Sequence, residues 1–149
     1  MFVQTFAADN TASDLAMYLP TAFSVLLQTG EIEDPSCTYL LIRDHDEVVA
    51  YALVRAGSSS SHVHGDPQTE LQRFYVDQRY HGIGLAHEMM QACVESAKAS
   101  GARTIWLGVW ERNTRAIRFY EKCGFATVGT QHFRLGRDLQ TDRVMALQF

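Results

Sequence analysis

The sequence lacks three features that would each assign it to a large class of proteins. It has three cysteines among 149 residues and no C-x-x-C pair, which argues against both a disulfide framework and a zinc site. No apolar run approaches the roughly 18 residues of a membrane-spanning helix. The amino terminus lacks a basic start followed by an apolar core, the pattern of a secretory signal. We therefore expect a cytoplasmic protein that does not enter a membrane and binds no metal.

The sequence also lacks an excess of positive charge. Lys and Arg number 13 against 17 for Asp and Glu, and the formal net charge is −4. The two signs are mixed along the chain, without the basic stripe that a nucleic-acid partner requires. A mildly acidic surface suits a cationic small substrate, and it suits ordinary solubility equally well.

Hydrophobic residues make up 46% of the chain, enough for one core, so residues 1–149 are expected to form a single domain. In the second half, strands and helices alternate, which predicts an α/β sheet with helices packed on it. The capping pattern at residues 10–14 predicts an amino-terminal helical stretch, which Pro20 splits. Strands are expected at 38–43 and 48–55 (a hairpin), 71–76, 104–109, 125–130 and 143–149, and helices at 85–100 and 114–122.

The segment LQRFYVDQRYHGIGLAHE, residues 71–88, predicts a strand, a glycine-bearing turn and a long amphipathic helix. Such a turn directs free backbone N–H groups toward one point, with the positive end of the helix dipole behind them. That arrangement binds phosphate without a metal. Glycine suits the turn because a Cβ would hold the phosphate away from the backbone.

Three phosphate-binding motifs can be compared with this turn. A P-loop would need Gly-Lys-Ser/Thr, which is absent, and the dinucleotide fingerprint G-x-G-x-x-G fails at His87. The third is Q/R-x-x-G-x-G/A, which fits in two registers, one starting at Arg79 and one at His81. We prefer the second register for its distance from Val76; both use the same amides. A plain strand-to-helix turn would also fit this segment taken alone.

A second motif follows in residues 106–125, WLGVWERNTRAIRFYEKCGF. With the first motif, it resembles the GCN5-related N-acetyltransferase (GNAT) family, whose later motif reads N-x-x-A-I-x-F-Y-x-K-x-G-F. The resemblance implies a mixed, mostly antiparallel central sheet flanked by helices. Family members usually begin with a strand before the first helix, whereas Met1 lies nearly at that helix. The usual first strand is therefore expected to be lost, replaced or missing from this sequence.

The resemblance also implies acetyl-coenzyme A as co-substrate. The backbone of Phe74, Tyr75 and Val76 would pair with the pantetheine arm as an added strand, and Asn113 would bond the same arm as well as cap the following helix. The amides of the turn would hold the pyrophosphate. This predicted loop comprises His81, Gly82, Ile83, Gly84, Leu85, Ala86 and His87.

Two catalytic residues are implied in the same way. Tyr120 resembles the family's general acid, which would protonate the departing thiolate. Glu70 sits where histone-acetylating members place their catalytic glutamate, and it would take a proton from the amine; a solvated acid at the end of a strand is the alternative interpretation. Other relatives carry a glutamate at the position of Gly108, where glycine cannot serve, and Glu111 is a weaker substitute.

Within the family, the segments YHGIGL, WLGVWE and LGRDLQTDRVM resemble the bacterial spermine/spermidine acetyltransferase branch. This implies transfer of acetyl to a primary amine, with a polyamine or another small amine as acceptor. Protein amino groups are an alternative acceptor, and a coenzyme-A-binding module without catalysis is an alternative function. A homodimer is common in the family and is compatible with this chain.

Overall fold

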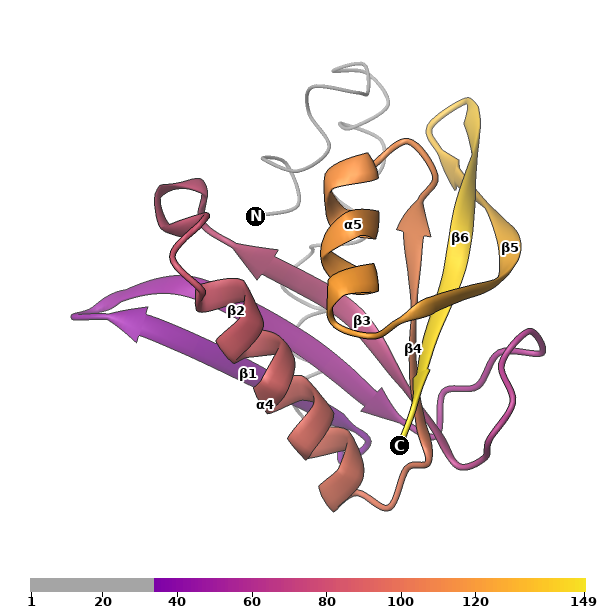
Figure 1. The fold of residues 1–149 in the computed structure, drawn as a ribbon, viewed down its shortest axis with the longest axis horizontal. Helices are drawn as coiled ribbons and strands as arrows, with labels where there is room; N and C mark the ends of the chain where they lie inside the picture. Colours follow the sequence, from indigo (N-terminus) through magenta and orange to yellow (C-terminus); the bar gives the residue numbers. More distant parts are fainter. Residues whose placement is uncertain (1–33) are drawn as a thin grey trace.

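The computed structural model describes residues 34–149. Within them, a six-stranded sheet has the order β1-β2-β3-β4-β6-β5, and two α-helices cover one of its faces (Figure 1). The β3–β4 pair is parallel and the other neighbours are antiparallel, which confirms the expected mixed, mostly antiparallel sheet. The elements are β1 Cys37–Asp44, β2 Glu47–Ala56, β3 Gln68–Val76, a 3-10 turn Gln78–Tyr80, α4 Leu85–Ala99, β4 Thr104–Trp110, α5 Thr114–Lys122, β5 Ala126–Leu135 and β6 Asp138–Gln148.

The predicted hairpin and both predicted helices of this region are confirmed, and the strand boundaries need correction. β3 begins at Gln68 and not at 71, so Glu70 lies inside the strand. β5 and β6 are longer than predicted and form a hairpin that turns at Gly136, whose φ is 63°. The amino-terminal helical stretch and the question of the first strand lie outside the described residues.

The core forms between α4 and the sheet. Met89, Met90, Cys93 and Ala97 are buried on one face of α4, at the spacing that places side chains on the same side of a helix. They pack in one cluster with the buried side chains of β2 and β4. Burial raises the pKa of the Cys93 thiol to about 12, so this cysteine is an unreactive core residue.

β3 and β4 pair over a short distance and then separate. Among the described residues, their ladder covers only Gln68–Glu70 against Thr104–Trp106. The β2–β3 register then shifts so that Gln72 is an extra residue on β3, and such a bulge bends a strand. Past this point β3 stays with β2 while β4 stays with β6. The two strands diverge in Figure 1, and each presents one backbone edge toward the opening between them.

The two faces of the sheet are distinct. Ile105, Leu107 and Val109 of β4 belong to the cluster that contains α4 and α5. Trp106, between them in sequence, packs on the other face with Val63 and Val144. Successive side chains of a strand point to opposite faces of the sheet, so odd-numbered residues of β4 face the helices and even-numbered residues face the other side. No helix within residues 34–149 is long and apolar enough to cross a bilayer.

Candidate active site

A cleft of about 1060 Å³ opens where β3 and β4 separate. Residues of β3, β4, the turn before α4, the start of α4 and α5 line it, with one residue each from β2 and β6. Most of the residues predicted for the site are brought together here. The predicted residues that line the cleft are Phe74, Tyr75, Val76, His81, Gly82, Gly84, Ala86, His87, Asn113 and Tyr120.

Two predicted loop residues and one predicted catalytic residue are not among those that line the cleft. The side chain of Ile83 is directed to solvent, with 68% of the residue exposed, and Leu85 packs on the core cluster. Glu70 lies at the last position where β3 and β4 are still paired, opposite Trp106. Its carboxylate accepts a hydrogen bond from Ser58 Oγ at 2.7 Å. Glu70 is therefore engaged with Ser58, although the residues that follow it in β3 line the cleft.

The turn before α4 has the geometry of an anion site. Gly82 and Gly84 have φ values of 83° and 87°, in the left-handed region that favours glycine. Gly84 is the N-cap of α4 and provides no side-chain hydrogen bond to the first helical amides. A Cβ built on either glycine meets nothing within 4 Å, so there is open space in front of the turn. The first amides of α4 are thus available to an anion in the cleft.

Basic side chains of α5 reach the same cleft. Arg115, Arg118 and Lys122 line it, opposite the amino-terminal end of α4. Together with the helix dipole of α4, they provide positive charge on both sides of the space in front of the turn. A diphosphate with an attached phosphorylated nucleotide has the negative charge that such walls attract.

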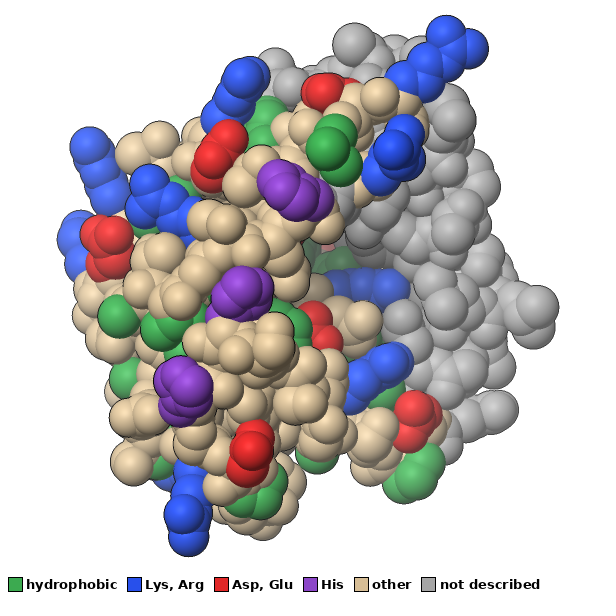
Figure 2. All heavy atoms as spheres, turned by 90° about the vertical axis from the view of Figure 1, so that its right-hand side faces the viewer, with side chains coloured by type: hydrophobic (Ala, Val, Ile, Leu, Met, Phe, Trp, Pro, Cys, Tyr) green, Lys and Arg blue, Asp and Glu red, His purple; other side chains and the backbone are tan. Residues whose placement is uncertain are grey.

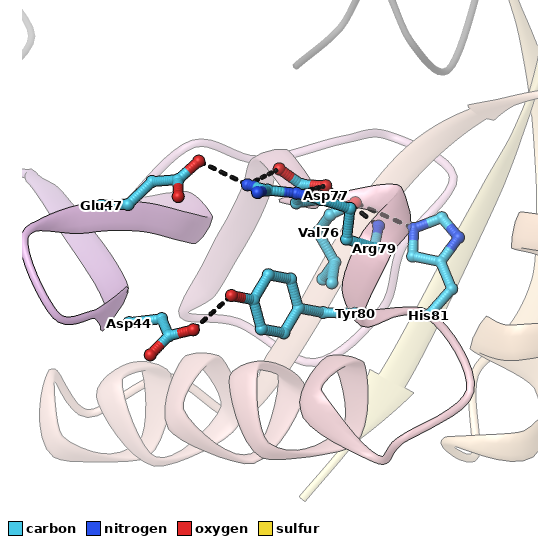
Figure 3. A network of polar contacts seen from close by, with 7 residues as sticks. All are labelled: Asp44, Glu47, Val76, Asp77, Arg79, Tyr80 and His81. Carbon is cyan, nitrogen blue, oxygen red and sulfur yellow. Dashed lines mark hydrogen bonds and ion pairs between the residues drawn. The ribbon is translucent and has the colours of Figure 1, made fainter.

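A network of polar contacts ties the 3-10 turn to the β1–β2 hairpin (Figure 3). Arg79 donates to Glu47 and also to Asp77, at 2.9 Å from Nη2 to Oδ2. Asp77 caps the turn by accepting from the Arg79 amide at 3.0 Å. These bonds to Arg79 lower the pKa of Asp77 to about 2. Tyr80 donates to Asp44 on the hairpin. The segment that leads into the glycine turn is therefore held at several points.

This network distinguishes between the two alternative registers of the Q/R-x-x-G-x-G/A motif. Arg79 is bonded to carboxylates and is not among the residues that line the cleft, whereas His81 lines it. The His81 ring is hydrogen-bonded to the carbonyl oxygen of Val76 at 2.8 Å (Figure 3), which links the end of β3 to the turn. The arrangement favours the register that starts at His81.

Tyr120 stands on α5 among aromatic rings. Its ring lies edge-on to that of Phe74 with centroids 6.2 Å apart, and 6.0 Å from that of Phe125. Burial raises the pKa of the Tyr120 phenol, and Cys93 and Cys123 add smaller contributions. The phenol therefore stays neutral at physiological pH, as a proton donor in the cleft must.

Asn113 shows the capping role expected of it. It is the N-cap of α5, and its side-chain oxygen accepts from the amide of Ala116 at 3.2 Å. His87, at the start of α4, lies against the Phe119 ring of α5 with centroids 5.1 Å apart. These contacts set α5 against the start of α4, so that the predicted acid and the predicted phosphate turn lie on the same cleft.

The sequence prediction missed Asp142. This residue of β6 lines the cleft, and its atom Oδ1 is buried without a hydrogen-bond partner among residues 34–149. Burial raises the Asp142 pKa to about 6. Our predicted strand began at residue 143, which left Asp142 in a polar connection. The burial pattern along β6 does not alternate regularly, so the sequence held no clear signal that would have placed Asp142 in the strand.

Charge on the surface is mixed. Figure 2 shows one face of the molecule, on which Lys and Arg side chains are scattered among Asp and Glu side chains. They do not gather into a single basic surface there. This face offers no platform for a nucleic-acid backbone.

The sequence model of the Acetyltransferase (GNAT) family matches residues 4–125. That match spans most of the chain and includes the turn before α4 and the whole of α5. The chain belongs to the GNAT acetyltransferase family. As a GNAT member, it is an acetyltransferase.

Similar proteins agree with this assignment. The GNAT chain is 38% identical over 114 residues to an uncharacterized N-acetyltransferase of Mycobacterium tuberculosis, covering 76% of this chain and 69% of that protein. It is also 38% identical over 64 residues to the spermine/spermidine N(1)-acetyltransferase of Bacillus subtilis, covering 42% of each. The second match is partial and does not assign this chain to that branch.

Solved structures share the GNAT fold. The PaiA N-acetyltransferase from Thermoplasma acidophilum, solved in complex with coenzyme A, superposes with a TM-score of 0.77 over 99% of this chain and 86% of that one, at 15% identity. A spermidine/spermine N-acetyltransferase from Vibrio cholerae gives 0.65 over 83% and 73%, at 19% identity. At these identities the likeness establishes the fold alone.

Proposed function

We propose that this GNAT protein transfers the acetyl group of acetyl-coenzyme A to a primary amine. The supporting observation is one cleft that combines a glycine turn at a helix amino terminus with a neutral phenol on a facing helix. The first feature suits a diphosphate and the second suits a departing thiolate. Their co-location on the same cleft is what an acyl transfer from a coenzyme thioester needs.

The residues present fit the coenzyme. Amides between Gly82 and His87 would hold the diphosphate, and Arg115, Arg118 and Lys122 would add charge to that end of the cleft. The backbone of β3 at 74–76 would bond the pantetheine arm as an added strand. Acetyl-coenzyme A supplies an activated acyl group whose thiolate leaves readily.

Tyr120 would donate its proton to the sulfur as the thiolate leaves. An N–H of β3 near Phe74 or Tyr75 would stabilise the negative charge that develops on the thioester oxygen. The Phe74, Phe119 and Phe125 rings around Tyr120 hold the phenol in place and keep water from it. Removal of a proton from the amine requires a base, for which Glu70 was the residue predicted from the sequence.

The acceptor is proposed to be a small primary amine, with polyamines as the first class to test. The partial match to the spermine/spermidine N(1)-acetyltransferase of Bacillus subtilis and the acidic charge balance support this choice. Protein amino termini and lysines are the alternative acceptors. A coenzyme-binding protein without catalysis is the alternative function.

A calorimetric titration and a turnover assay test the proposal together. Acetyl-coenzyme A should bind with measurable heat, and thiol should be released in the presence of spermine, spermidine or simple alkylamines. Turnover on peptides alone would replace the polyamine proposal with the protein-acceptor alternative. Binding without turnover on any amine of the panel would favour the non-catalytic alternative, and absence of binding would contradict the whole proposal.

Two further expectations accompany the proposed function. A homodimer is expected from the family and can be measured by light scattering of the pure protein. A cytoplasmic location remains a prediction, which fractionation of cells that express the native gene would check.

A further inference from the structure

Asp142 differs from every other described residue that lines the cleft, because it alone carries a carboxylate. The remaining ionisable side chains of that lining are Arg, Lys, His and Tyr. A cleft that must accept an anionic coenzyme and a cationic amine needs one site of each sign. The basic residues of α5 and the turn before α4 supply the first, and Asp142 is placed to supply the second.

The position of Asp142 on the sheet separates it from the proposed coenzyme side. Asp142 lies two residues before Val144, which packs with Trp106 on the face opposite α4 and α5. Alternation along β6 therefore places the Asp142 side chain on that same opposite face. Tyr120 reaches the cleft from α5, on the helix face. The two residues thus approach the opening between β3 and β4 from opposite sides of the sheet.

Glycine at position 108 makes room for this carboxylate. Gly108 lies on β4 and also lines the cleft. A Cβ built on Gly108 would lie 3.2 Å from Asp142 Oδ2 and 2.8 Å from Gln131 Nε2. Any larger side chain at 108 would therefore displace one of these two groups. The absence of a side chain on β4 leaves the space in front of Gly108 to a carboxylate supplied by the neighbouring strand.

Among residues 34–149, no cationic side chain forms an ion pair with Asp142. Its backbone partners are Trp110 on β4 and Gln131 on β5, which are neutral, and Arg73 and Tyr120 are lining residues of the same cleft. Burial is the cause of its raised pKa, without a contribution from a neighbouring charge. The orphaned Oδ1 has no partner among residues 34–149, and buried polar groups normally have one. A donor from a bound ligand would satisfy this atom.

We infer that Asp142 receives the acceptor amine, first as the carboxylate that binds its ammonium form and then as the base that removes its proton. This inference rests on the proposed amine acetylation. It gives the acceptor a chemical class: a primary amine that enters as a cation from the face opposite α4 and α5.

The proton and electron balance of the step can be written from these residues. Asp142 takes one proton from the ammonium group, and the nitrogen lone pair forms the C–N bond to the acetyl carbon. The C–S bond breaks with its electron pair going to sulfur, which takes the phenol proton of Tyr120. The nitrogen gives its second proton to the Tyr120 phenolate, and Asp142 releases its proton to solvent. The products are the N-acetyl amine, coenzyme A and one proton.

The other candidate bases near the cleft within the described part of the chain are already engaged. The His81 ring bonds the Val76 carbonyl. His87 packs on Phe119 at the proposed phosphate end of the cleft. The Glu70 carboxylate accepts from Ser58, and Glu70 is not among the described lining residues. Asp142 is the group with a raised pKa, an unsatisfied oxygen and a place in the cleft.

The test compares Asp142→Asn with Asp46→Asn, a matched change at an exposed acid in the β1–β2 turn. The rate constant kcat/KM is measured from pH 5 to 10, with acetyl-coenzyme A and the best amine of the panel. Asp142→Asn should lose about 10²–10⁴-fold at pH 7 and recover as the pH rises toward the amine pKa, where free amine is abundant. Coenzyme affinity should stay within about threefold, and Asp46→Asn should behave as wild type.

A wild-type pH profile in Asp142→Asn would overturn the inference, and so would the same loss appearing in Glu70→Gln instead. A readout without turnover is the pKa of Asp142, followed through its carboxyl carbon by NMR. Addition of spermidine should lower this pKa, because an adjacent ammonium favours the carboxylate. An unchanged pKa would overturn the inference even in an active enzyme. Absence of turnover in the wild type, with the pKa shift present, would instead contradict the proposed function.

Discussion

Strands β3 and β4 are hydrogen-bonded to each other at one end and separated at the other, and the two ends have different roles. At the closed end, Gln68–Glu70 pair with Thr104–Trp106. Trp106 Nε1 donates to the Ser58 carbonyl at 2.8 Å, and Gln68 Nε2 donates to the Val63 carbonyl at 2.9 Å. At the open end, beyond the bulge at Gln72, the strands part and line a cleft.

The difference shows how a continuous sheet produces a binding site. Backbone groups that pair between strands at the closed end contribute to the fold, whereas at the open end we propose that β3 pairs with an extended ligand instead of with β4. One extra residue on β3 is sufficient to redirect the strand. If this comparison is right, changes at the open end alter catalysis and binding, and changes at the closed end alter stability.

The largest effect is expected from Tyr120→Phe at the open end. Removal of the phenol proton should lower kcat by about 10²–10⁴-fold, because the thiolate would leave without a donor. The aromatic contacts with Phe74 and Phe125 are retained, so coenzyme affinity and melting temperature should change little. Unchanged kcat in a steady-state assay would show that the acid is another group.

Ile105→Ala, at the closed end, should lower stability without changing coenzyme binding. Ile105 is fully buried in the cluster between the sheet and the helices, and truncating such a side chain costs about 2–5 kcal/mol of unfolding free energy. Urea unfolding measures this loss. Coenzyme affinity of the remaining folded protein should be close to that of wild type. A selective loss of affinity without destabilisation would contradict the division between the two ends.

Gly84→Val should weaken coenzyme binding through the backbone. The φ of 87° is a conformation that costs a non-glycine residue about 1–2 kcal/mol, and the turn would relax away from its anion-binding form. Affinity for coenzyme A should fall at least about tenfold, since each factor of ten corresponds to about 1.4 kcal/mol. Calorimetry provides the measurement.

Gly101→Val is the matched control for that change. Gly101 lies just beyond the other end of α4 with a φ of 88°, and a Cβ there also meets nothing within 4 Å. The strain is comparable, so both variants should lose similar stability. Gly101→Val should keep its coenzyme affinity. Equal losses of affinity in the two variants would show that strain, and not the anion site, causes the effect.

The smallest effect is a gain in stability from Asp142→Asn. Burial raises the folded-state pKa from 3.8 to about 6, so the folded protein binds the proton more tightly than the unfolded chain. The contribution of Asp142 to stability is therefore most favourable below about pH 4 and decreases as the pH rises through 6, where half of the folded molecules carry the buried charge.

Asparagine removes that charge. At pH 7, unfolding free energy should rise by about 1–2 kcal/mol, a value reduced from the full shift because Asp142 is partly exposed to solvent. The dependence of stability on pH between 4 and 6 should also become flatter. Asp46→Asn should change neither quantity. A less stable Asp142→Asn at pH 7 would show that the carboxylate has a partner that stabilises the fold.

The sequence predicted the bounds of helix α5 accurately and those of the β5–β6 hairpin less well. Helix α5 was predicted at 114–122 and observed at Thr114–Lys122, because Asn113 supplies a cap and Gly124 a stop. The β5–β6 hairpin was predicted too short. In its outer part Leu139 is exposed while Gln140 is buried, so hydrophobicity does not indicate the strand there, and pairing between strands defines the extent of the hairpin.

The residues of the candidate site also fall into those that the sequence predicted well and those that it did not. The glycine turn, Asn113 and Tyr120 belong to contiguous motifs, and the structure places them on one cleft as the motifs imply. Glu70 was inferred from its place at the start of the predicted strand and from the resemblance to histone-acetylating members; the strand begins earlier, and the Glu70 carboxylate accepts a hydrogen bond from Ser58. Asp142 is distant in sequence from both motifs and was not predicted.

Local chemistry encoded in the chain is sufficient for the family, the helix boundaries and the glycine turn, because glycine conformation, caps and hydrophobic period act over a few residues. The choice between Glu70 and Asp142 depends on where β3 leaves β4 and on which side chain of β6 comes to lie beside Gly108. Those are contacts between strands far apart in sequence. They exist only once the sheet has formed, since burial, and with it the raised pKa of Asp142, is a property of the packed structure.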